Sequence, residues 1–353
     1  LGPAQIGRAL ARHGSPARAL DALAELGPAA PRLATADAVA AEAELVAGHG
    51  GRLLYRGEPG YPAQLDSLDH APWMLTVLGD PACLAGPLVA MVGARNASAA
   101  GRKMARDMAQ GLAEAGIGVV SGLARGIDTA AHEGALDGGV TVAVIATGID
   151  VVYPPENERL MARIGAAGCV VSERALGGSP TAAQFPRRNR LVAGLALGVV
   201  VVEAATRSGS LITARLAGDQ GREVMAVPGS PMDQRHRGTN QLLREGAHLV
   251  ETAADVVAAL APFAVAAPSP PPAVRSPRPS EPAPLAPAKP PPLPPGGLEA
   301  LLKSRLTVEP VAVDELIRQC HASPSQVQKA LLELELAGEI ERHPGNRVSL
   351  AVV

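Results

Sequence analysis

The chain has 353 residues, 47% of them hydrophobic and only 2% aromatic, and its net charge is −2. This length predicts two or three domains with cores of Ala, Val and Leu, and the small net charge excludes a protein that binds nucleic acid over its whole surface. Three widely spaced cysteines argue against a disulfide framework and a structural zinc site, and without a signal peptide or a membrane-spanning apolar run we expect a cytoplasmic protein with no membrane contact.

Residues 1–50 are rich in alanine and carry leucines at helical spacing, which predicts two or three short helices. Ser15 and Pro16 have the residue types of a helix N-cap and first turn. Such a bundle resembles a helix-hairpin-helix or SAM-like module, which would contact nucleic acid, contact another protein or serve only as a packing module. Residues 51–86 are expected to be a connector of short strands and turns.

The main domain is predicted to span residues 51–261, where from Leu88 onward apolar strands alternate with glycine loops and helices. Continuous Val-rich runs are typical of strands covered on both faces. Alternation of this kind predicts an α/β domain with an extended Rossmann-like, doubly wound parallel sheet. The predicted strands are 88–93, 117–121, 140–146, 169–172, 198–203 and 223–227, and the predicted helices are 98–115, 126–137, 156–166, 186–197, 209–220 and 238–245.

Two segments follow the main domain. Residues 262–297 contain fifteen prolines and are predicted to be an extended linker. Residues 298–353 show three short helical patterns and then two strands around Pro344-Gly345-Asn346, which predicts a winged helix. Its third helix, which begins near Ser323, is neutral to acidic rather than basic. Protein contact is therefore at least as consistent with this module as DNA reading.

Ligands of a doubly wound sheet bind at the carboxyl ends of its strands. Arginines follow several of the predicted strands, beside small residues that let a phosphate approach closely. So many cations suit a polyanion better than a single phosphate, although we expect about half of them, above all Arg125 and Arg174, to hold loops instead. These arginines are Arg95, Arg125, Arg174, Arg187, Arg188, Arg190 and Arg207.

The stretch Gln184-Phe185-Pro186-Arg187-Arg188-Asn189-Arg190 concentrates three of these arginines beside an aromatic residue. Pro186 fits the first turn of a helix, where free N–H groups already favour an anion. Phe185 offers a face on which a base could stack. Because Arg187 continues the stripe of Leu191 and Leu195, we expect Arg187 to be the inner phosphate ligand and Arg188 the outer one.

Other chemistries are weakly supported. Gly93 lacks the spacing of a dinucleotide fingerprint, and a P-loop and metal-ligand spacings are absent from the sequence. Ser121 or Ser210 would need a partner base to act as a nucleophile. His132 lies inside a predicted helix and is expected to be structural. Asp128, Glu173 and Glu203 could be acid–base groups, but we expect them to orient the arginines.

Several motifs together resemble the family of DNA-processing protein A (DprA, also called Smf). They are Tyr61-Pro62, Val92-Gly93-Ala94-Arg95, the run from Ser121 to His132, Gly148 with Tyr153-Pro154, Ser172-Glu173, Phe185 to Arg190, Glu203, Ser208 to Ala214, and Val227-Pro228-Gly229. The resemblance implies a non-catalytic protein without a cofactor that binds single-stranded DNA, protects incoming strands during natural transformation and loads the RecA recombinase. It also implies a homodimer formed through the Rossmann domain.

The resemblance places the DNA site on a defined set of residues. They are Gly93, Arg95, Ser121, Gly122, Phe185, Arg187, Arg188, Asn189 and Arg190, with Ser208, Gly209 and Ser210 lining the pocket. The alternative is a nucleotide-acting enzyme like the phosphoribohydrolases, whose glycine-rich segment is matched poorly by Pro228-Gly229-Ser230 and Gly238-Thr239. A weaker alternative is a transcription regulator acting through the winged helix.

Overall fold

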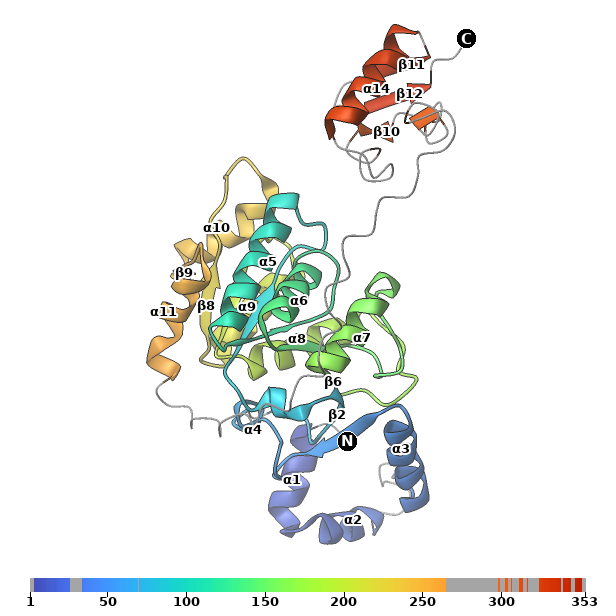
Figure 1. Ribbon diagram of the computed structural model, residues 1–353. Helices are drawn as coiled ribbons and strands as arrows, with labels where there is room; N and C mark the ends of the chain where they lie inside the picture. Colours follow the sequence, from blue (N-terminus) through green and yellow to red (C-terminus); the bar gives the residue numbers. More distant parts are fainter. Residues whose placement is uncertain are drawn as a thin grey trace. The chain divides into compact units, whose positions relative to one another are not determined.

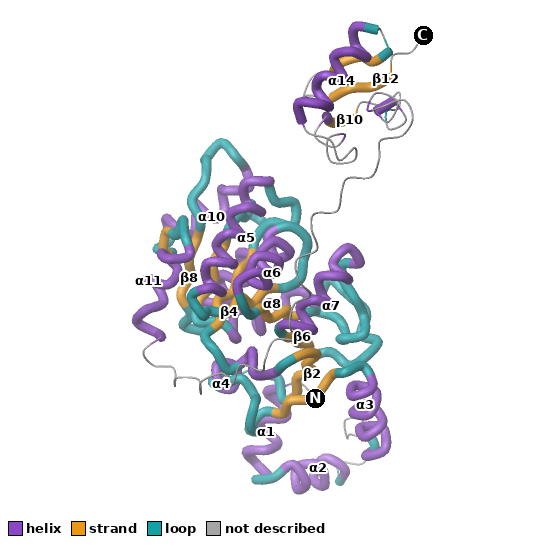
Figure 2. The backbone as a smooth tube through the Cα atoms, viewed as in Figure 1, coloured by secondary structure: helices purple, strands orange, loops and turns teal. Residues whose placement is uncertain are grey.

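The computed structural model describes residues 3–25, 34–68 and 70–264, and from the C-terminal segment residues 298, 302–303, 306, 311–313, 316, 324–337, 339–343 and 347–350. The chain divides into two compact units, Leu1–Ala273 and Val274–Val353. Each has its own sheet (Figures 1 and 2). Most of the predicted linker, the predicted wing turn and most of the first two helices of the predicted winged helix lie outside the described residues.

The larger unit contains a nine-stranded sheet with the order β1-β2-β6-β5-β4-β3-β7-β8-β9. From β6 to β9 all neighbours pair in parallel, as the Val-rich runs predicted. The six predicted strands are confirmed within two residues at each end, and the short β9 is an addition. The parallel strands are β3 (Leu88–Val92), β4 (Gly118–Ser121), β5 (Thr141–Val144), β6 (Cys169–Ser172), β7 (Gly198–Val201), β8 (Glu223–Ala226) and β9 (His248–Leu249).

The short strands expected between residues 51 and 86 are confirmed, and they form the antiparallel edge of this sheet. β1 (Gly51–Tyr55) pairs with β2 (Met74–Gly79), and β2 pairs with β6. Leu75 and Val77 of β2 are fully buried and extend the core. Eighteen residues, which include several turn signals and the short helix α4 (Ala63–Asp66), separate β1 from β2, so the sequence did not show that the two strands pair.

Helices cover both faces of the sheet, as a doubly wound fold requires (Figure 1). On one face, α5 (Ala99–Glu114), α6 (Ile127–Gly138), α7 (Glu158–Ala167) and α11 (Ala253–Ala264) pack on Val89, Met91, Val119 and their neighbours. On the other face, α8 (Gln184–Leu195) and α9 (Gly209–Asp219) pack on Ala90, Val92 and Val120. The six predicted helices are confirmed, with α10 at Arg237–Arg244, and α11 was not predicted.

The order in which the chain adds strands to the sheet reverses between β3 and β7, although all these strands are parallel. From β3 it winds outward through β4, β5 and β6, and it then returns to place β7 on the other side of β3. The connections that leave β3 and β7 therefore diverge to opposite faces, and a crevice opens between them at the carboxyl ends of the strands. This crevice is the part of the fold in which the topology itself leaves room for a ligand.

The N-terminal part has three helices, α1 (Pro3–His13), α2 (Pro16–Ala24) and α3 (Ala36–Gly48). The predicted cap is present, because the Ser15 side chain accepts a hydrogen bond from the Arg18 N–H at 3.3 Å. Nothing in the fold identifies these helices as a SAM-like module, which stays a prediction. Among the described residues there is no helix long and apolar enough to cross a membrane.

The smaller unit contains a three-stranded antiparallel sheet of order β10-β12-β11 and one long helix. The predicted third helix is confirmed as α14 (Pro324–Leu336), and the predicted wing strands are confirmed as β11 (Ile340–His343) and β12 (Arg347–Leu350). The additional strand β10 (Val311–Ala312) was not predicted because it is only two residues long. Leu331, Leu334 and Val348 are among the residues that form a separate core.

Candidate functional site

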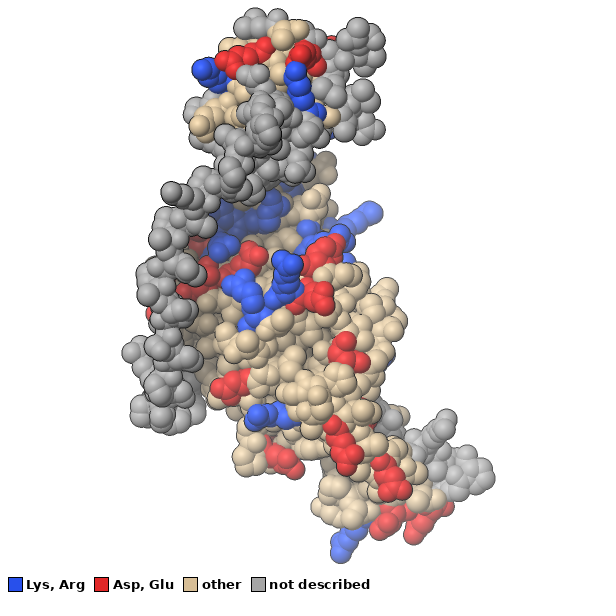
Figure 3. Space-filling view, turned by 45° about the vertical axis from the view of Figure 1, so that its right-hand side comes forward, with Lys and Arg blue, Asp and Glu red and all other residues tan. Residues whose placement is uncertain are grey.

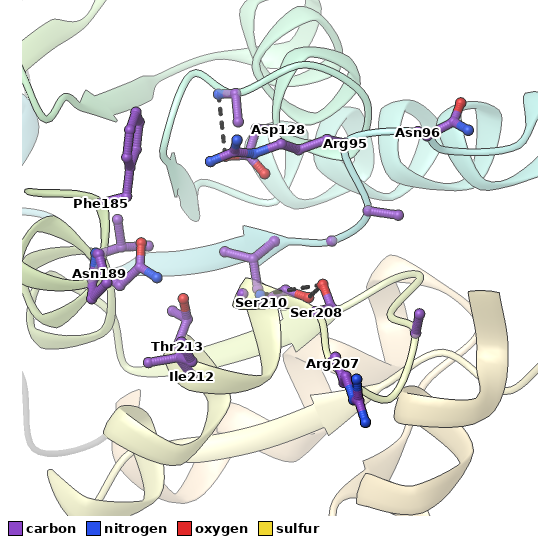
Figure 4. Close-up of a pocket in the computed structure, with 18 of the residues that line it drawn as sticks. Arg95, Asn96, Asp128, Phe185, Asn189, Arg207, Ser208, Ser210, Ile212 and Thr213 are labelled. Atoms are coloured by element: carbon purple, nitrogen blue, oxygen red, sulfur yellow. Dashed lines mark hydrogen bonds between the residues drawn. The ribbon is translucent and has the colours of Figure 1, made fainter. Parts of the chain in front are cut away.

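A cavity of about 530 Å³ lies in the crevice at the carboxyl ends of β3 and β7. The loop after β3, the start of α8 and the start of α9 direct side chains into it (Figure 4). Most of the predicted site residues come together here. Those that line the cavity are Gly93, Arg95, Phe185, Arg188, Asn189, Ser208, Gly209 and Ser210. Gly122 lines a smaller hollow that shares Arg95, Phe185 and Arg188 with the cavity.

Arg188 forms part of the cavity wall and is only 8% exposed. Its guanidinium Nη1 donates to the Val144 carbonyl at 3.1 Å, while its Nε has no hydrogen-bond partner among the described residues. Burial lowers the pKa of Arg188, an effect that the nearby Asp128 carboxylate opposes. A buried guanidinium keeps its charge, so the site contains a cation poorly solvated by water.

Gly122 makes room for this arginine. A Cβ at residue 122 would lie 1.3 Å from Nη1 of Arg188, so any other residue would expel the guanidinium. The glycine in the loop after β4 therefore leaves the space that Arg188 occupies.

The expected order of the two arginines was wrong. Arg187 is exposed and does not line the cavity, whereas Arg188 is the inner cation. The reason is helical phase: residues 188, 191, 192 and 195 form the buried stripe of α8. Leu191 and Leu195 lie three and seven residues after Arg188. Residues at these spacings share one helix face, just as residues four apart do, which is the spacing on which the prediction for Arg187 rested.

Arg95 is held across the cavity by an aromatic ring. Its guanidinium carbon lies 5.1 Å from the centre of the Phe185 ring. A cation over the face of an aromatic ring is attracted by the ring's negative charge, so this contact orients Arg95 without neutralising it. A positive charge and an aromatic surface thus lie side by side in the lining of the cavity.

The N-terminus of α9 forms another wall of the cavity. Ser208 caps the helix and lies 2.7 Å from the hydroxyl of Ser210, while a Cβ at Gly209 would meet no atom within 4 Å. The first N–H groups of a helix lack partners within the helix and favour an anion. Their presence beside Arg95 and Arg188 adds a second source of positive potential.

Asp128 is buried and organises the loop after β4. Its carboxylate accepts hydrogen bonds from the N–H groups of Gly122 at 3.1 Å and Ala124 at 3.3 Å. Burial raises the pKa of Asp128, and the charge of Arg188 counteracts this rise. Asp128 was expected to orient an arginine, but its hydrogen bonds hold the backbone of the loop, and Arg188 acts on it through charge.

Besides Gly122 and Arg187, two further members of the predicted site, Arg190 and Ser121, lie outside the cavity. The Arg190 guanidinium donates to the His70 carbonyl at 2.7 Å and forms an ion pair with Glu173. Arg190 therefore connects α8 to the segments that carry His70 and Glu173. The predicted pairing of Glu173 with an arginine is confirmed. Ser121 is fully buried and donates its hydroxyl proton to the Met91 carbonyl, so it links neighbouring strands.

The two arginines expected to hold loops differ. Arg125 forms the expected carboxylate pair, with Nη1 at 3.5 Å from Oε1 of Glu156. The expectation for Arg174 has no such support, because its Nε is buried without a hydrogen-bond partner among the described residues.

Glu203 has a different role from the expected one. It is fully buried at the end of β7 and accepts hydrogen bonds from the backbone N–H of Ser98, at 3.0 Å, and from its hydroxyl. Ser98 caps α5, so Glu203 fixes the start of that helix, and within the described part of the chain it forms no ion pair with an arginine. The carboxylate came directly after a strand in the sequence, but its partner lies 105 residues earlier and was not recognisable from spacing.

His132 is structural, as predicted. It is fully buried, and its Nδ1 lies 2.7 Å from the Thr141 hydroxyl. Burial lowers the pKa of His132 to about 3, so the ring is neutral at physiological pH.

Sequence analysis missed Arg235, which lines the cavity beside Arg207. It forms an exposed ion pair with Asp233, at 2.7 Å between Nη2 and Oδ2. Arg235 lies nine residues beyond the end of β8, too far for the rule that ligands follow strand ends. In the sequence, Arg235 could have been related to the site only through its position in the loop that begins with Pro228-Gly229.

The cationic character of the site is local. Figure 3 shows one face of the molecule, on which Lys and Arg side chains lie among Asp and Glu side chains rather than forming a uniform basic surface. This mixture agrees with the net charge of −2. Four arginines, Arg95, Arg188, Arg207 and Arg235, nevertheless converge on one cavity.

Known families match both units. The model of the family described as DNA recombination-mediator protein A matches residues 52–261, and that of the DprA winged helix domain matches residues 286–346. The chain is 48% identical over 199 residues to DNA processing protein DprA from Streptococcus pneumoniae, covering 56% of this chain and 70% of that protein. It is 34% identical over 310 residues to protein Smf from Synechocystis, covering 82% and 78%.

Two solved structures are similar to this fold. The X-ray structure of DNA processing protein A from S. pneumoniae matches with a TM-score of 0.61 and 40% identity, covering 69% of this chain and 82% of that one. A structure of DNA processing protein A from Helicobacter pylori, described for its single-stranded DNA binding mode, matches with a TM-score of 0.55 and 29% identity, covering 60% and 96%.

Proposed function

The chain belongs to the DNA recombination-mediator protein A family, and from this premise we propose that it binds single-stranded DNA in the cavity between β3 and β7. The protein from H. pylori, which is similar to this chain, binds single-stranded DNA. The observation that carries the proposal here is the contact of Arg95 with the face of Phe185, at the entrance to a cavity walled by the buried Arg188. A single strand presents both a phosphate and an unpaired base to such a pair.

The proposed contacts differ between the depth and the rim of the cavity. Arg188 and the N-terminus of α9 provide the inner positive potential. Arg95, Arg207 and Arg235 meet phosphates at the rim, and Asn189 supplies a polar group that can hydrogen-bond either a phosphate or a base. Arg187 is exposed and contributes from outside the cavity. Because the inner cation is only 8% exposed and lies in the cavity wall, a flexible single strand reaches it more readily than a stiff duplex does.

We propose a binding protein rather than an enzyme. A phosphoribohydrolase-like reaction would use a carboxylate, and Glu203 instead hydrogen-bonds Ser98 at the start of α5. Ser208 and Ser210 lie within hydrogen-bond distance of each other and are parts of a helix cap. Incubation with nucleoside monophosphates is expected to release no free base. Release that is abolished by Glu203→Gln would contradict the proposal.

The first prediction tests the cavity directly. Arg95→Ala removes a charge and a partner of Phe185, and loss of a charge-assisted hydrogen bond of about 1.5–3 kcal/mol corresponds to roughly 10- to 150-fold weaker binding. The matched control is Arg106→Ala, because Arg106 pairs with Glu133 and Asp137 on the helical face of α5 and α6. Fluorescence anisotropy with a labelled oligothymidylate measures both. Equal affinities of the two variants would place the site elsewhere.

The biological role is proposed from the family. We infer that the protein protects incoming single strands in the cytoplasm during natural transformation and loads RecA onto them. RecA strand exchange, with single-stranded DNA covered by a single-strand-binding protein, is expected to accelerate when the full chain is added and not when Arg95→Ala is added. Acceleration by both proteins would separate RecA loading from the cavity.

The assembly and domain boundaries are also proposals. We propose a homodimer through the Rossmann domain, which sedimentation equilibrium would detect as twice the chain mass of 35.8 kDa. We propose domains at 1–50, 51–261 and 298–353 with a linker at 262–297. Limited proteolysis is expected to cut first within the linker, and a first cut inside 51–261 would contradict these boundaries.

A further inference from the structure

A second aromatic ring lies beside Phe185. The rings of Tyr153 and Phe185 have their centres 5.6 Å apart and their planes inclined by 52°. The whole chain has only two Phe, three Tyr and one Trp, so two of its six aromatic residues meet at this one place. Phe185 already has the Arg95 guanidinium over its ring, whereas Tyr153 is 36% exposed. Tyr153 therefore presents the more accessible aromatic surface.

Tyr153 borders a hollow that continues from the main cavity. The hollow has a volume of about 20 Å³ and is lined by Gly122, Ala124, Arg125, Tyr153 and Pro154 together with Arg95, Phe185 and Arg188, which also line the cavity. A base cannot enter so small a space, but it can lie across the mouth against the ring of Tyr153. A strand that leaves the cavity past Phe185 reaches this ring next.

The segment that carries Tyr153 is firmly anchored. Asn157 is buried at the end of the same turn, and its side-chain amide donates to the Leu123 carbonyl at 2.8 Å and to the Thr129 hydroxyl at 2.9 Å. The Asn157 N–H also donates to the Pro154 carbonyl at 3.0 Å. A ring held in this way loses little conformational freedom when a base stacks on it.

A cation lies at the same hollow. Arg125 forms a 3.5 Å ion pair with Glu156, and the two side chains are 60% and 59% exposed. Such an exposed pair contributes little to stability, so a phosphate can compete for the guanidinium. Charge and aromatic surface thus recur at the hollow in the combination found at the main cavity.

We propose that Tyr153 and Arg125 form a second nucleotide subsite, in which Tyr153 stacks a base of the strand leaving the cavity and Arg125 binds a neighbouring phosphate. This inference rests on the proposed binding of single-stranded DNA. It deepens that proposal by extending the DNA path past Phe185 onto the turn between β5 and α7.

The test compares oligothymidylates of increasing length on the full chain and its variants. Tyr153→Leu is expected to leave the affinity of the shortest binding oligonucleotide unchanged and to lower that of longer ones roughly 5- to 150-fold, the range of one stacked base. Tyr153→Phe keeps the ring and should bind like the unmodified protein. Tyr55→Leu is the matched control, because Tyr55 is a 39% exposed tyrosine on β1.

Each outcome decides between the proposals. If the unmodified protein binds long oligonucleotides and Tyr153→Leu binds them equally well, the second subsite is wrong and the main cavity stands. Equal weakening at every length would place Tyr153 in the main cavity, and an equal effect of Tyr55→Leu would show a general loss of structure, so both results overturn the subsite. If the unmodified protein binds no single-stranded DNA at any length, the proposed function itself fails.

An independent readout tests the phosphate contact. Arg125→Gln should reduce the magnitude of the slope of log affinity against log salt by about 0.7 for long oligonucleotides, the value for one phosphate contact on a single strand. The slope for the shortest binding oligonucleotide should not change. An unchanged slope at all lengths would remove Arg125 from the subsite.

Discussion

At the scale of single residues, the site depends on Arg188 rather than on its neighbour. The sequence concentrates Arg187, Arg188 and Arg190 in one helical turn, from which an anion site was predicted there. It could not assign their directions, because spacings of three, four and seven residues all return to the same helix face. The deciding residue is Gly122, which lies 66 positions earlier in the sequence and leaves the space that Arg188 fills.

The second prediction separates the two arginines. Arg188→Gln is expected to weaken single-stranded DNA binding more than tenfold, because it removes a poorly solvated charge, whereas Arg187→Gln should cost roughly two- to fivefold. Anisotropy titrations measure both effects, and circular dichroism melting checks that each variant is folded. A larger loss for folded Arg187→Gln than for folded Arg188→Gln would restore the order expected from the sequence.

The third prediction concerns His132 and acid stability. The unfolded chain protonates this histidine below its ordinary pKa of 6.5, whereas the folded protein keeps it neutral down to a pKa of about 3. Protons therefore bind preferentially to the unfolded state between pH 6.5 and 3, and this group lowers the free energy of unfolding by about 1.4 kcal/mol for each unit that the pH falls.

His132→Gln removes this titration. Urea unfolding of both proteins at several pH values between 7 and 4 isolates the contribution of His132, because other titrating groups are common to both. The stability advantage of the unmodified protein should shrink by the stated amount as the pH falls below 6.5. A pH-independent difference would mean that His132 is not buried as a neutral ring.

At the scale of elements, the sequence predicted what is continuous and missed what is short. The runs of β3 to β7 are buried on both faces, and β8 is buried at Met225 and Ala226, so these strands could be placed within two residues. β1 and β2 were expected as short strands, but their pairing with the main sheet was not predicted, because a long loop separates them. β9 and β10 have two residues each, too few for any periodic signal.

The candidate site was predictable to a similar extent. Gly93 and Arg95 lie within three residues of the end of β3, Ser208 caps the helix that follows β7, and the topology of a doubly wound sheet brings such positions together. Arg235 and Tyr153 lie in longer loops, far from the end of the preceding strand. The rule that ligands bind at strand ends therefore did not predict that these residues lie near the cavity. Glu203 also lies just after a strand, but its carboxylate accepts a hydrogen bond from Ser98. No spacing rule relates these two residues.

The fourth prediction tests the contact between β7 and α5. Ser98→Ala removes the N-cap of α5 and leaves the buried Glu203 carboxylate with one hydrogen-bond donor fewer. Loss of a cap costs about 0.5–2 kcal/mol, and an unsatisfied buried acceptor adds about 1–3 kcal/mol. Ser67→Ala is the matched control, because the exposed Ser67 hydroxyl donates only to the Gln64 carbonyl one turn earlier.

Urea unfolding compares these two serine variants. Ser98→Ala should lower the free energy of unfolding by roughly 1.5–5 kcal/mol and Ser67→Ala by less than about 0.5 kcal/mol. Equal small effects would show that Glu203 has another partner in solution and would reopen its role at the site.

At the scale of the whole molecule, function depends on where charge lies rather than on how much there is. A net charge of −2 excluded bulk attraction to DNA, and the fold places four arginines at one cavity all the same. The order β6-β5-β4-β3-β7-β8-β9 explains this convergence, because it opens a crevice where β3 and β7 meet. Whole-chain composition could not show such clustering, since it is created by loops that are far apart in the sequence.

The most direct test of the central claim is the salt dependence of DNA binding by the unmodified full chain. The arginines at the cavity are Arg95, Arg188, Arg207 and Arg235. With each neutralising one phosphate, the slope of log affinity against log salt should be about −3 for the shortest single strand that binds. Single-stranded DNA should also bind more tightly than duplex of the same length at every salt concentration. A slope near zero, or tighter binding of the duplex, would contradict a single-strand site in this cavity.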